Sequence, residues 1–448
     1  MNFNTIPRIE IHAHSHYSNI RLLDSINRPK DLILTAYKLG LKGICLTDHE
    51  CLCGAVEWLE LEKELKKNKL ISEDFKCGIG NEIYLTDTRD KKQKYYHFIL
   101  IAKDTIGFQQ LCELSSKSWY NSYYDRGMER VPTLKSELKE IISKNPGHVI
   151  ATSACIAGED AQSLLKLKTA EYNHNDADIL AARKQLNDFL DYCLDIFKDD
   201  FYIEVAPSTD KDQIYINKRI INVAKAFGIK IIYGCDAHYL LKENRVIHKA
   251  YLNSKEGERE VDSFYAFAHL MDNNEAWNYL KESYDETIFI ELLNNSMEIY
   301  NKITSYEIFH NPIIPRVDVK NYIKRPDIAD LLSDYPVIAS LFNSDNLQER
   351  YWVNECWNEM ERTGWNKNKK YIERLETEAD IIKVIGEKLG NCLFEYFNTF
   401  QHFIDLFWDC GSLVGPGRGS SVCFLSNRLL GITQLDPIEW GLAEWRST

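Results

Sequence analysis

The sequence predicts an α/β fold whose first part is a distorted parallel barrel. Residues 1 to about 240 repeat one pattern, in which a short apolar run ends in a polar residue and a helical segment follows. Those polar residues are of the types that parallel barrels collect at the carboxyl ends of their strands. An open doubly wound sheet is the alternative, but no glycine-rich nucleotide turn follows the first apolar run.

Two histidines lie at the end of the first apolar run. Residues 9–13 alternate in the manner of a short strand, and His12 and His14 stand two positions apart. Side chains two apart on a strand point the same way, which suits two ligands of one metal ion. A histidine pair alone is more often a surface pair or an internally satisfied pair, so the prediction depends on what the later units supply.

The later units repeat the arrangement. A helix is expected from Pro29 to Leu39, where Gly40 ends it, and further helices at 55–69 and 213–227. Apolar segments between the helices are found at 43–47, 76–82, 98–102, 148–152, 201–205 and 229–233. Residues able to bind metal accompany them: His12, His14, Asp24, His49, Glu82, His97, Cys155, Asp236 and His238.

These nine residues are all of types that bind Zn²⁺, Mn²⁺ or iron. Most follow a strand, where a parallel barrel would turn them toward one mouth. His97 is the exception, because it begins its strand. Each residue alone has an ordinary structural explanation, such as a helix cap or a buried thiol. Their joint occurrence over successive strand units favours one metal centre.

Composition limits the class of protein. A chain of 448 residues with 44% hydrophobic and 27% charged residues predicts a soluble protein of two or three domains. No apolar run approaches the roughly 20 residues of a membrane span, and the twelve cysteines lack framework spacing. We therefore expect a cytoplasmic protein with no membrane partner. The formal charge of −13 does not suggest a DNA-coating protein, although metal ions can supply local positive charge.

The last third of the chain has a different character. An expected linker at Asn311–Pro315 precedes long amphipathic helices, and the glycine-dense stretch 415–421 follows them. We expect a strand at 412–414 before this stretch and a helix capped by Ser420 after it. Such a turn can bind a phosphate through backbone N–H groups and an arginine. The candidate nucleotide-binding residues are Gly417, Arg418, Gly419, Ser420 and Ser421.

Several short motifs together resemble a known family. In order they are His-Ala-His-Ser from His12, Leu-Thr-Asp-His to His49, Gly-Asn-Glu to Glu82, Tyr-His to His97, Ser-Ala-Cys to Cys155 and Asp-Ala-His to His238. This series over residues 8–245 is similar to PHP (polymerase and histidinol phosphatase) domains, in the form found in bacterial DNA polymerase III alpha subunits. The resemblance implies a (β/α)7-like PHP barrel over 1–300.

The resemblance also implies a ligand set. One metal would take His12, His14, Glu82 and Asp236, which would be the catalytic residues. A second would share Glu82 with His97 and Cys155, and a third would take Asp24, His49 and His238. Up to three divalent ions (Zn, Mn or Fe) could bind phosphate oxygens and acidify a water. In the polymerase branch such a site implies 3′→5′ exonuclease activity.

The second region resembles the same family. Tyr396-Phe397, the glycine stretch and Leu430–Pro437 look like the entry to its palm, which is similar to β-type nucleotidyltransferases. Residues 301–448 would then be a mostly helical segment and an incomplete palm. The paired aspartates that bind polymerase Mg²⁺ do not follow. The chain would then be either a truncated form or a split subunit. Polymerisation would need a second chain carrying the aspartates, with DNA and a deoxynucleoside triphosphate as the further partners.

Two other functions remain open from the sequence. The chain could be a stand-alone phosphoesterase of the histidinol-phosphatase type, acting on a small phosphomonoester. It could also be a non-catalytic scaffold, in which metal ions only hold the fold. The glycine stretch favours the polymerase family over the first alternative, because a small-molecule phosphatase has no use for it. The complete ligand set argues against the second.

Overall fold

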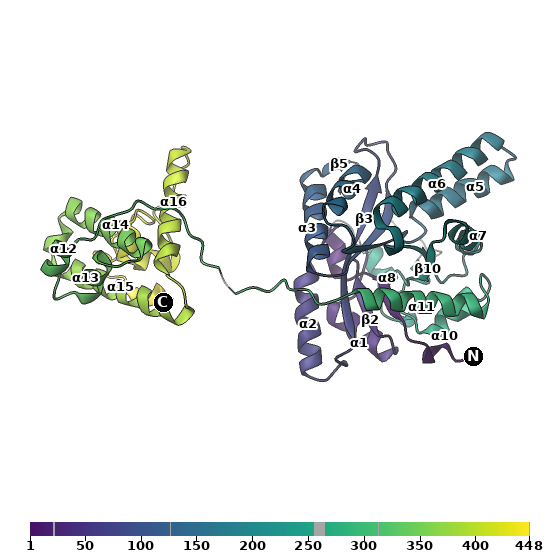
Figure 1. Ribbon diagram of the computed structural model, residues 1–448, viewed down its shortest axis with the longest axis horizontal. Helices are drawn as coiled ribbons and strands as arrows, with labels where there is room; N and C mark the ends of the chain where they lie inside the picture. The colour runs from purple at the N-terminus through teal and green to yellow at the C-terminus, as the bar shows by residue number, and fades with distance from the viewer. Residues whose placement is uncertain (21–22, 126, 255–264, 312, 448) are drawn as a thin grey trace. The chain divides into compact units, whose positions relative to one another are not determined.

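The computed structural model describes residues 1–448 except 21–22, 126, 255–264, 312 and 448. The chain divides into two compact units, residues 1–308 and 309–448. The first unit is mixed α/β and the second is helical (Figure 1). The mixed α/β class predicted from the sequence is therefore confirmed.

A curled eight-stranded sheet forms the centre of the first unit. The strands follow the order β1-β2-β3-β4-β8-β9-β10, and β7 (Pro132–Leu134) pairs with β3 outside this path. The strands of the main path are β1 (Ile9–Ala13), β2 (Gly43–Leu46), β3 (Lys76–Thr86), β4 (Tyr96–Ala102), β8 (Val149–Thr152), β9 (Phe201–Val205) and β10 (Lys230–Tyr233). A separate hairpin pairs β5 (Tyr123–Asp125) with β6 (Met128–Arg130).

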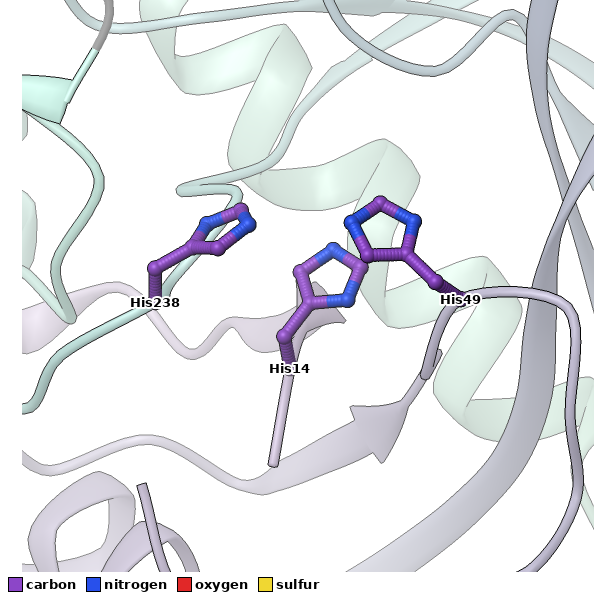
Figure 2. A group of neighbouring side chains, drawn as sticks. All are labelled: His14, His49 and His238. Atoms are coloured by element: carbon purple, nitrogen blue, oxygen red, sulfur yellow. The ribbon is translucent and has the colours of Figure 1, made fainter. Parts of the chain in front are cut away.

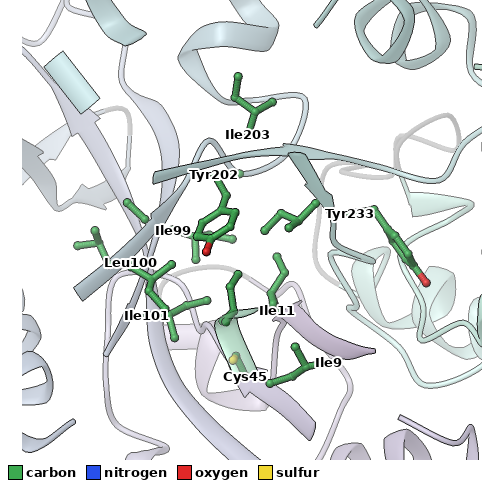
Figure 3. Packing of buried hydrophobic residues seen from close by; sticks show 14 of the residues in the cluster. Ile9, Ile11, Cys45, Ile99, Leu100, Ile101, Tyr202, Ile203 and Tyr233 are labelled. Carbon is green, nitrogen blue, oxygen red and sulfur yellow. The ribbon is translucent and has the colours of Figure 1, made fainter. Parts of the chain in front are cut away.

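Helices surround this sheet (Figure 1). They are α1 (Pro29–Lys38), α2 (Ala55–Lys67), α3 (Thr105–Tyr120), α4 (Lys135–Lys144), α5 (Glu159–Tyr172), α6 (Asp176–Phe197), α7 (Lys211–Phe227), α8 (Arg245–Leu252), α10 (Asn273–Leu280) and α11 (Glu286–Lys302). The apolar faces of the main strands and of these helices other than α8 form one core, in which Ile9, Ile99 and Tyr202 are fully buried (Figure 3).

One strand runs against the others. The pairs β1–β2, β2–β3, β8–β9 and β9–β10 are parallel, whereas β4 is antiparallel to both β3 and β8. A short connection suffices between β3 and β4, because antiparallel neighbours need no crossover helix. The barrel is therefore distorted as expected, and the cause is this reversed strand.

The seam between the first and last strands closes at one end. Beyond β10, Ala237 forms a parallel bridge with Ala13, and His14 N–H donates to Ala237 O at 3.0 Å. Farther along the seam, α11 supplies the missing partners: Ile9 N–H donates to Ser296 Oγ (3.3 Å) and Asn295 Nδ2 donates to Ile231 O (2.8 Å). The two edge strands thus keep their backbone groups satisfied.

The chain leaves the first unit only after α11. Tyr306 is buried against the barrel, where its hydroxyl donates to Ala102 O at 2.7 Å and accepts from Ile79 N at 3.1 Å. These bonds explain why the division between the units falls after Ile308. The described residues of 303–325 form neither helix nor strand, which suits a linker.

The second unit contains α12 (Pro326–Leu331), α13 (Pro336–Phe342), α14 (Leu347–Thr363), α15 (Lys369–Leu389), α16 (Phe394–Asp409) and α17 (Leu425–Leu429). They pack around a core of their own, with Trp352 and Leu375 fully buried. The strand predicted at 412–414 is wrong, because these residues are irregular and largely exposed. No helix in the described part of the chain has the length and apolar character needed to cross a lipid bilayer.

Candidate metal centre

All nine predicted metal ligands lie at one edge of the sheet. Parallel strands end at a common edge, and isolated bridges extend the pairing there: His49 pairs with Glu82, and Ala13 with Ala237. These bridges bring the segments after β2 and β10 against β3 and β1. The ligands are buried, except that His97 is partly exposed.

The reversed strand explains the position of His97. This residue begins β4, and because β4 is antiparallel to β3 its first residues lie beside the carboxyl end of β3. His97 Nδ1 lies 2.8 Å from Glu82 Oε1, and Cys155 Sγ lies 3.5 Å from the same nitrogen. The sequence predicted His97 as a ligand although it begins its strand, and the reversed direction of β4 now explains why it lies beside the others.

A first group of donors surrounds the ends of His12 and His14. The two Nε2 atoms are 3.0 Å apart. Asp236 Oδ1 lies 3.1 Å from the first and 3.2 Å from the second, and Glu82 Oε2 lies 3.3 Å from His14 Nε2. Four side chains from three separate strand ends therefore face a common point.

A further group contains three histidines whose rings lie side by side (Figure 2). The His14 ring stacks against His49 at 4.3 Å and against His238 at 4.5 Å between centroids. Asp24 Oδ2 lies 2.7 Å from His49 Nε2 and 3.1 Å from His238 Nε2. Asp24 itself is fixed by Tyr265, whose hydroxyl donates to Oδ1 at 2.9 Å.

Hydrogen bonds on the far side of the rings set their orientation. His12 Nδ1 contacts Glu204 Oε1 at 2.6 Å, and His238 Nδ1 contacts the Asp236 carbonyl at 2.7 Å. A proton on each Nδ1 leaves the Nε2 lone pair directed into the site, which is the arrangement of metal-bound histidines. Sequence reasoning missed Glu204. The available signal was a glutamate inside the apolar run 201–205.

His14 is oriented through a serine. Its Nδ1 lies 3.1 Å from Ser18 Oγ, and this hydroxyl donates to Asp48 Oδ1 at 2.7 Å. Because the hydroxyl proton goes to Asp48, the oxygen is left to accept from His14 Nδ1. Ser15 also donates to Asp48, from its backbone N–H at 2.6 Å and from Oγ at 2.8 Å. Asp48 thus supports His14 from outside the donor cluster.

The cluster fits divalent cations. Glu82 Oε2 lies 2.8 Å from His49 Nδ1 and Asp236 Oδ1 lies 3.1 Å from His12 Nε2, and neither contact has the geometry of a hydrogen bond. A buried carboxylate oxygen that faces imidazole nitrogens in this way is costly unless a proton or a metal cation is shared between them. Three sets each bring one donor atom per residue within 4.8 Å of one another: His12, His14 and Glu82; Glu82, His97 and Cys155; and His14, His49 and His238.

Charge within the cluster is strongly coupled. Burial by itself would raise the pKa of Glu82, but His97, His49 and His12 hold that pKa well below its usual range. Burial would lower the pKa of His12, whereas Asp236, Glu204 and Glu82 raise it well above its usual value. The carboxylates therefore stay ionised, and they favour a positive charge at His12 Nε2. A proton or a metal ion can supply that charge.

His14 behaves in the opposite way. Burial, together with His49 and His238 on either side, lowers the pKa of His14 to about 3. Its imidazole is neutral at ordinary pH and keeps a lone pair for a metal.

Three residues at the cluster have a left-handed backbone. The predicted ligand Asp236 has φ 47°, Glu50 next to His49 has φ 55°, and Ala154 next to Cys155 has φ 61°. Residues other than glycine adopt this region at a cost, and such residues are concentrated at functional sites. The strained positions direct a carboxylate and a thiol into the same cluster.

The candidate nucleotide loop lies in the second unit. Gly417 has φ 105°, and a Cβ there would lie 2.9 Å from Val422 Cγ1 and from Thr433 Cγ2, so only glycine fits. Arg418 and Gly419 are exposed, as are Ser420 and Ser421.

The helix after this loop differs from the prediction. Residues Gly419–Cys423 form a 3₁₀ turn and α17 begins only at Leu425, so the prediction that Ser420 caps the helix is wrong. Ser421 Oγ donates to Arg418 O at 2.8 Å, and Glu378 accepts from the backbone N–H groups of Leu425 and Ser426. Because a buried glutamate takes the N–H groups that start α17, a phosphate could use only the loop itself.

Comparison with known proteins agrees with the fold. Residues 10–208 match the PHP domain family, and this range contains seven of the nine predicted ligands. This part of the first unit is therefore a PHP domain. Residues 347–446 match the family described as the bacterial DNA polymerase III alpha NTPase domain.

Relatives in other organisms match nearly the whole chain. The DNA-directed DNA polymerase of Bacillus phage SPbeta is 37% identical over 98% of this chain and 35% of its own length. The DNA polymerase III subunit alpha of Campylobacter jejuni is 30% identical over 96% of this chain and 34% of its own length. The chain is similar over nearly its whole length to bacterial DNA polymerase III alpha subunits, and it spans about a third of the length of the curated relatives it matches.

Among solved structures, a protein from Bifidobacterium adolescentis proposed as a metal-dependent phosphoesterase covers 62% of this chain and 97% of its own. The identity is 15% and the TM-score 0.31.

Proposed function

We propose that the PHP domain hydrolyses phosphodiester bonds at the 3′ end of DNA, as a metal-dependent 3′→5′ exonuclease. The observation that carries this proposal is the convergence of nine donor side chains on one cluster, in which buried carboxylate oxygens of Glu82 and Asp236 face histidine nitrogens at 2.8–3.3 Å. A multinuclear cation site beside a strand edge is the arrangement that phosphoester hydrolysis uses.

The donor types indicate which ions would bind. Imidazoles with one thiol and three carboxylates favour Zn²⁺, Mn²⁺ or iron over Ca²⁺, which prefers oxygen ligands. His12, His14, Glu82 and Asp236 would hold one ion. Glu82 would be shared with a second ion on His97 and Cys155, and Asp24, His49 and His238 would hold a third. When bound, such ions neutralise phosphate oxygens and acidify water.

The protein's own residues would position these ions. Glu82 is fully buried and ionised, and each of its oxygens faces a different group of histidines. Glu204 retains a proton on His12 Nδ1, and Ser18 does the same for His14, so both rings present Nε2 as a ligand. Glu82, His12, His14 and Asp236 are the residues that we expect to be required for hydrolysis.

A nuclease assay tests this function. The purified chain would be incubated with a 3′-labelled DNA strand and Mn²⁺ or Zn²⁺, and wild type would be compared with Glu82→Ala and with Glu286→Ala. Glu286 is an exposed carboxylate in the first turn of α11 and serves as the matched control. We expect the label to be released by wild type and by Glu286→Ala only. Equal and negligible release from all three would leave a metal-stabilised scaffold.

A stand-alone phosphatase of the histidinol-phosphatase type is the second candidate. It predicts release of phosphate from a small phosphomonoester and no action on DNA. The match of residues 347–446 to the polymerase family supports the DNA substrate instead.

We further propose that the second unit takes part in nucleotide polymerisation only together with additional polypeptide. The loop at 417–421 would contact a deoxynucleoside triphosphate, and carboxylates for Mg²⁺ would come from a second chain. The surface of α16 supports such a partner. Tyr396, Phe400, Phe403 and Phe407 recur at helical spacing, and each is 40–53% exposed. An aromatic stripe of this kind is typical of a protein interface.

Co-expression would test the second chain. A polypeptide that supplies the remaining polymerase region should co-purify with the wild-type chain, and DNA synthesis with Mg²⁺ should require both. Phe403→Asp with Phe407→Asp should abolish co-purification, whereas Tyr120→Asp, an exposed aromatic of the first unit, should not. Co-purification of the double variant would exclude α16 as the interface.

A further inference from the structure

A pocket opens directly beside the metal centre. It lies between the turn at 155–156, the segment 206–213 and the pairs 235–236 and 267–268, has a cavity volume of about 70 Å³ and is open to solvent on one side. We call it the β9–α7 pocket. Two predicted metal ligands, Cys155 and Asp236, form one wall, so a group bound in it would adjoin any phosphate held at the metal centre.

The remaining walls are of two kinds. Ile156, Pro207 and Phe267 are apolar, and Ser208, Asp210 and Gln213 are polar. No lysine, arginine or histidine is among the residues lining the pocket in the part of the chain that the structure describes. The pocket therefore does not suit a phosphate. It suits an uncharged group, attached to the phosphate, that has apolar faces and a polar edge.

Of the three polar side chains, Ser208 offers a hydroxyl donor, because its oxygen accepts from Asp210 N–H at 2.9 Å, and the other two offer acceptors. Asp210 Oδ1 accepts from the backbone N–H groups of Asp212 (2.9 Å) and Gln213 (3.2 Å), which leaves Oδ2 without a donor among the described residues. Gln213 is 7% exposed, and its Nε2 donates to Asn217 Oδ1 at 3.0 Å. Its Oε1 likewise has no donor among the residues described. Two acceptors thus remain for N–H groups of a ligand.

We infer that the β9–α7 pocket binds the base of the 3′-terminal nucleotide, with a preference for bases that carry an exocyclic amino group. This inference rests on the proposed nuclease function and names the part of the substrate that the site recognises. A base has two apolar faces and a hydrogen-bonding edge. Cytosine offers an N4 amino donor, whereas thymine offers the O4 acceptor at the equivalent position. Acceptors at Asp210 and Gln213 would favour cytosine.

One conservative substitution changes the recognition of the base without removing the cap that stabilises α7. In Asp210→Asn the side-chain oxygen can still cap α7, since asparagine and aspartate are equally good caps. The freed position then carries an amide donor in place of a carboxylate oxygen. Asp285→Asn is the matched control: Asp285 caps α11 through the N–H of Ile288 and does not line the pocket.

The primary test is binding, measured by calorimetry on the full chain in Mn²⁺ with dCMP and dTMP. Wild type should bind dCMP more tightly by about 5- to 50-fold, the scale of one or two base hydrogen bonds. Asp210→Asn should remove or reverse this preference, and Asp285→Asn should retain it. Equal affinity for the two nucleotides in wild type, or a preference that Asp210→Asn leaves intact, would overturn the pocket assignment.

Hydrolysis of bis(p-nitrophenyl) phosphate distinguishes this failure from failure of the proposed function. This substrate reports on the metal centre without a base. If turnover of this substrate depends on Glu82 but the chain shows no base preference, the proposed phosphodiesterase activity stands and the assignment of the β9–α7 pocket to a base is wrong. If the chain prefers one base but does not hydrolyse this substrate, the assignment of the β9–α7 pocket stands and the proposed nuclease activity is wrong.

Discussion

Glu204 Oε1 lies 2.6 Å from His12 Nδ1, so a carboxylate of β9 holds a ligand of β1 across the interior of the barrel. Glu204 is itself held, because Thr152 donates to its Oε2 at 2.6 Å and its backbone N–H donates to Ser153 Oγ at 3.1 Å. The strands β1, β8 and β9 thus jointly fix the ring of His12. Carboxylates in this position raise the basicity of a metal-bound imidazole.

The first prediction concerns this contact. Glu204→Gln keeps the shape of the side chain but removes its charge, and we expect metal affinity to fall about 10- to 100-fold. Competition with a chromogenic chelator measures the affinity. Glu291→Gln, at an exposed position of α11, is the control. An unchanged affinity in Glu204→Gln would show that Glu204 does not influence the ligand.

The second prediction concerns removal of metal. Buried carboxylates and histidines that share a cation should be less stable without it, because a ligand bound only to the folded state adds about 2.7 kcal/mol at one hundred times its Kd. We expect chelation to lower the thermal midpoint of the first unit by about 5 °C or more. Calorimetry before and after dialysis against EDTA measures the shift, and re-addition of Zn²⁺ or Mn²⁺ should reverse it. Identical midpoints would contradict metal binding.

The third prediction concerns pH. Burial raises the pKa of Asp160 to about 7, although Ser153 and backbone N–H groups partly oppose the rise. The carboxyl of an aspartate in an unfolded chain has a pKa of about 3.9. Because the folded pKa is the higher one, the folded state binds the proton more tightly, and stability contributed by Asp160 is lost as pH rises from about 4 to about 7. The loss amounts to roughly 4 kcal/mol.

Asp160→Asn removes this titration. The variant should gain stability relative to wild type between pH 5 and pH 8, as measured by thermal unfolding of metal-free protein at each pH. Asp195→Asn, whose carboxylate is exposed on α6, should show no such trend. If the difference in thermal midpoint between Asp160→Asn and wild type does not change with pH, the carboxyl of Asp160 does not titrate between pH 5 and pH 8.

The fourth prediction concerns the glycine loop. Gly417→Ala places a Cβ 2.9 Å from two methyl groups in a backbone conformation that alanine avoids, and should destabilise the second unit by about 1–3 kcal/mol. Gly415→Ala meets no atom within 4 Å and should be nearly neutral. Hydrogen exchange at Val422–Leu429 measures both. Equal protection in the two variants would contradict the packing described for Gly417.

Much of the fold was predictable from local pattern. Short apolar runs with polar ends identified the seven strands of the main path but not β5, β6 or β7, since alternation and strand-end chemistry depend only on neighbouring residues. The structure of the second unit was harder to predict from local pattern. Residues 412–414 are apolar enough to suggest a strand, but they have no partner strand and lie exposed. Glu378, distant in sequence, binds the start of α17 and sets where that helix begins.

The sequence by itself determined the ligand types, their order along the chain and the alternation that places His12 and His14 on one side. Only the tertiary structure decided how the strands are joined. The reversal of β4 brings His97 to the edge where its neighbours end, and the curl of the sheet places Glu204 behind His12. Strand direction and long-range register depend on contacts between residues far apart in the chain, which local sequence does not encode.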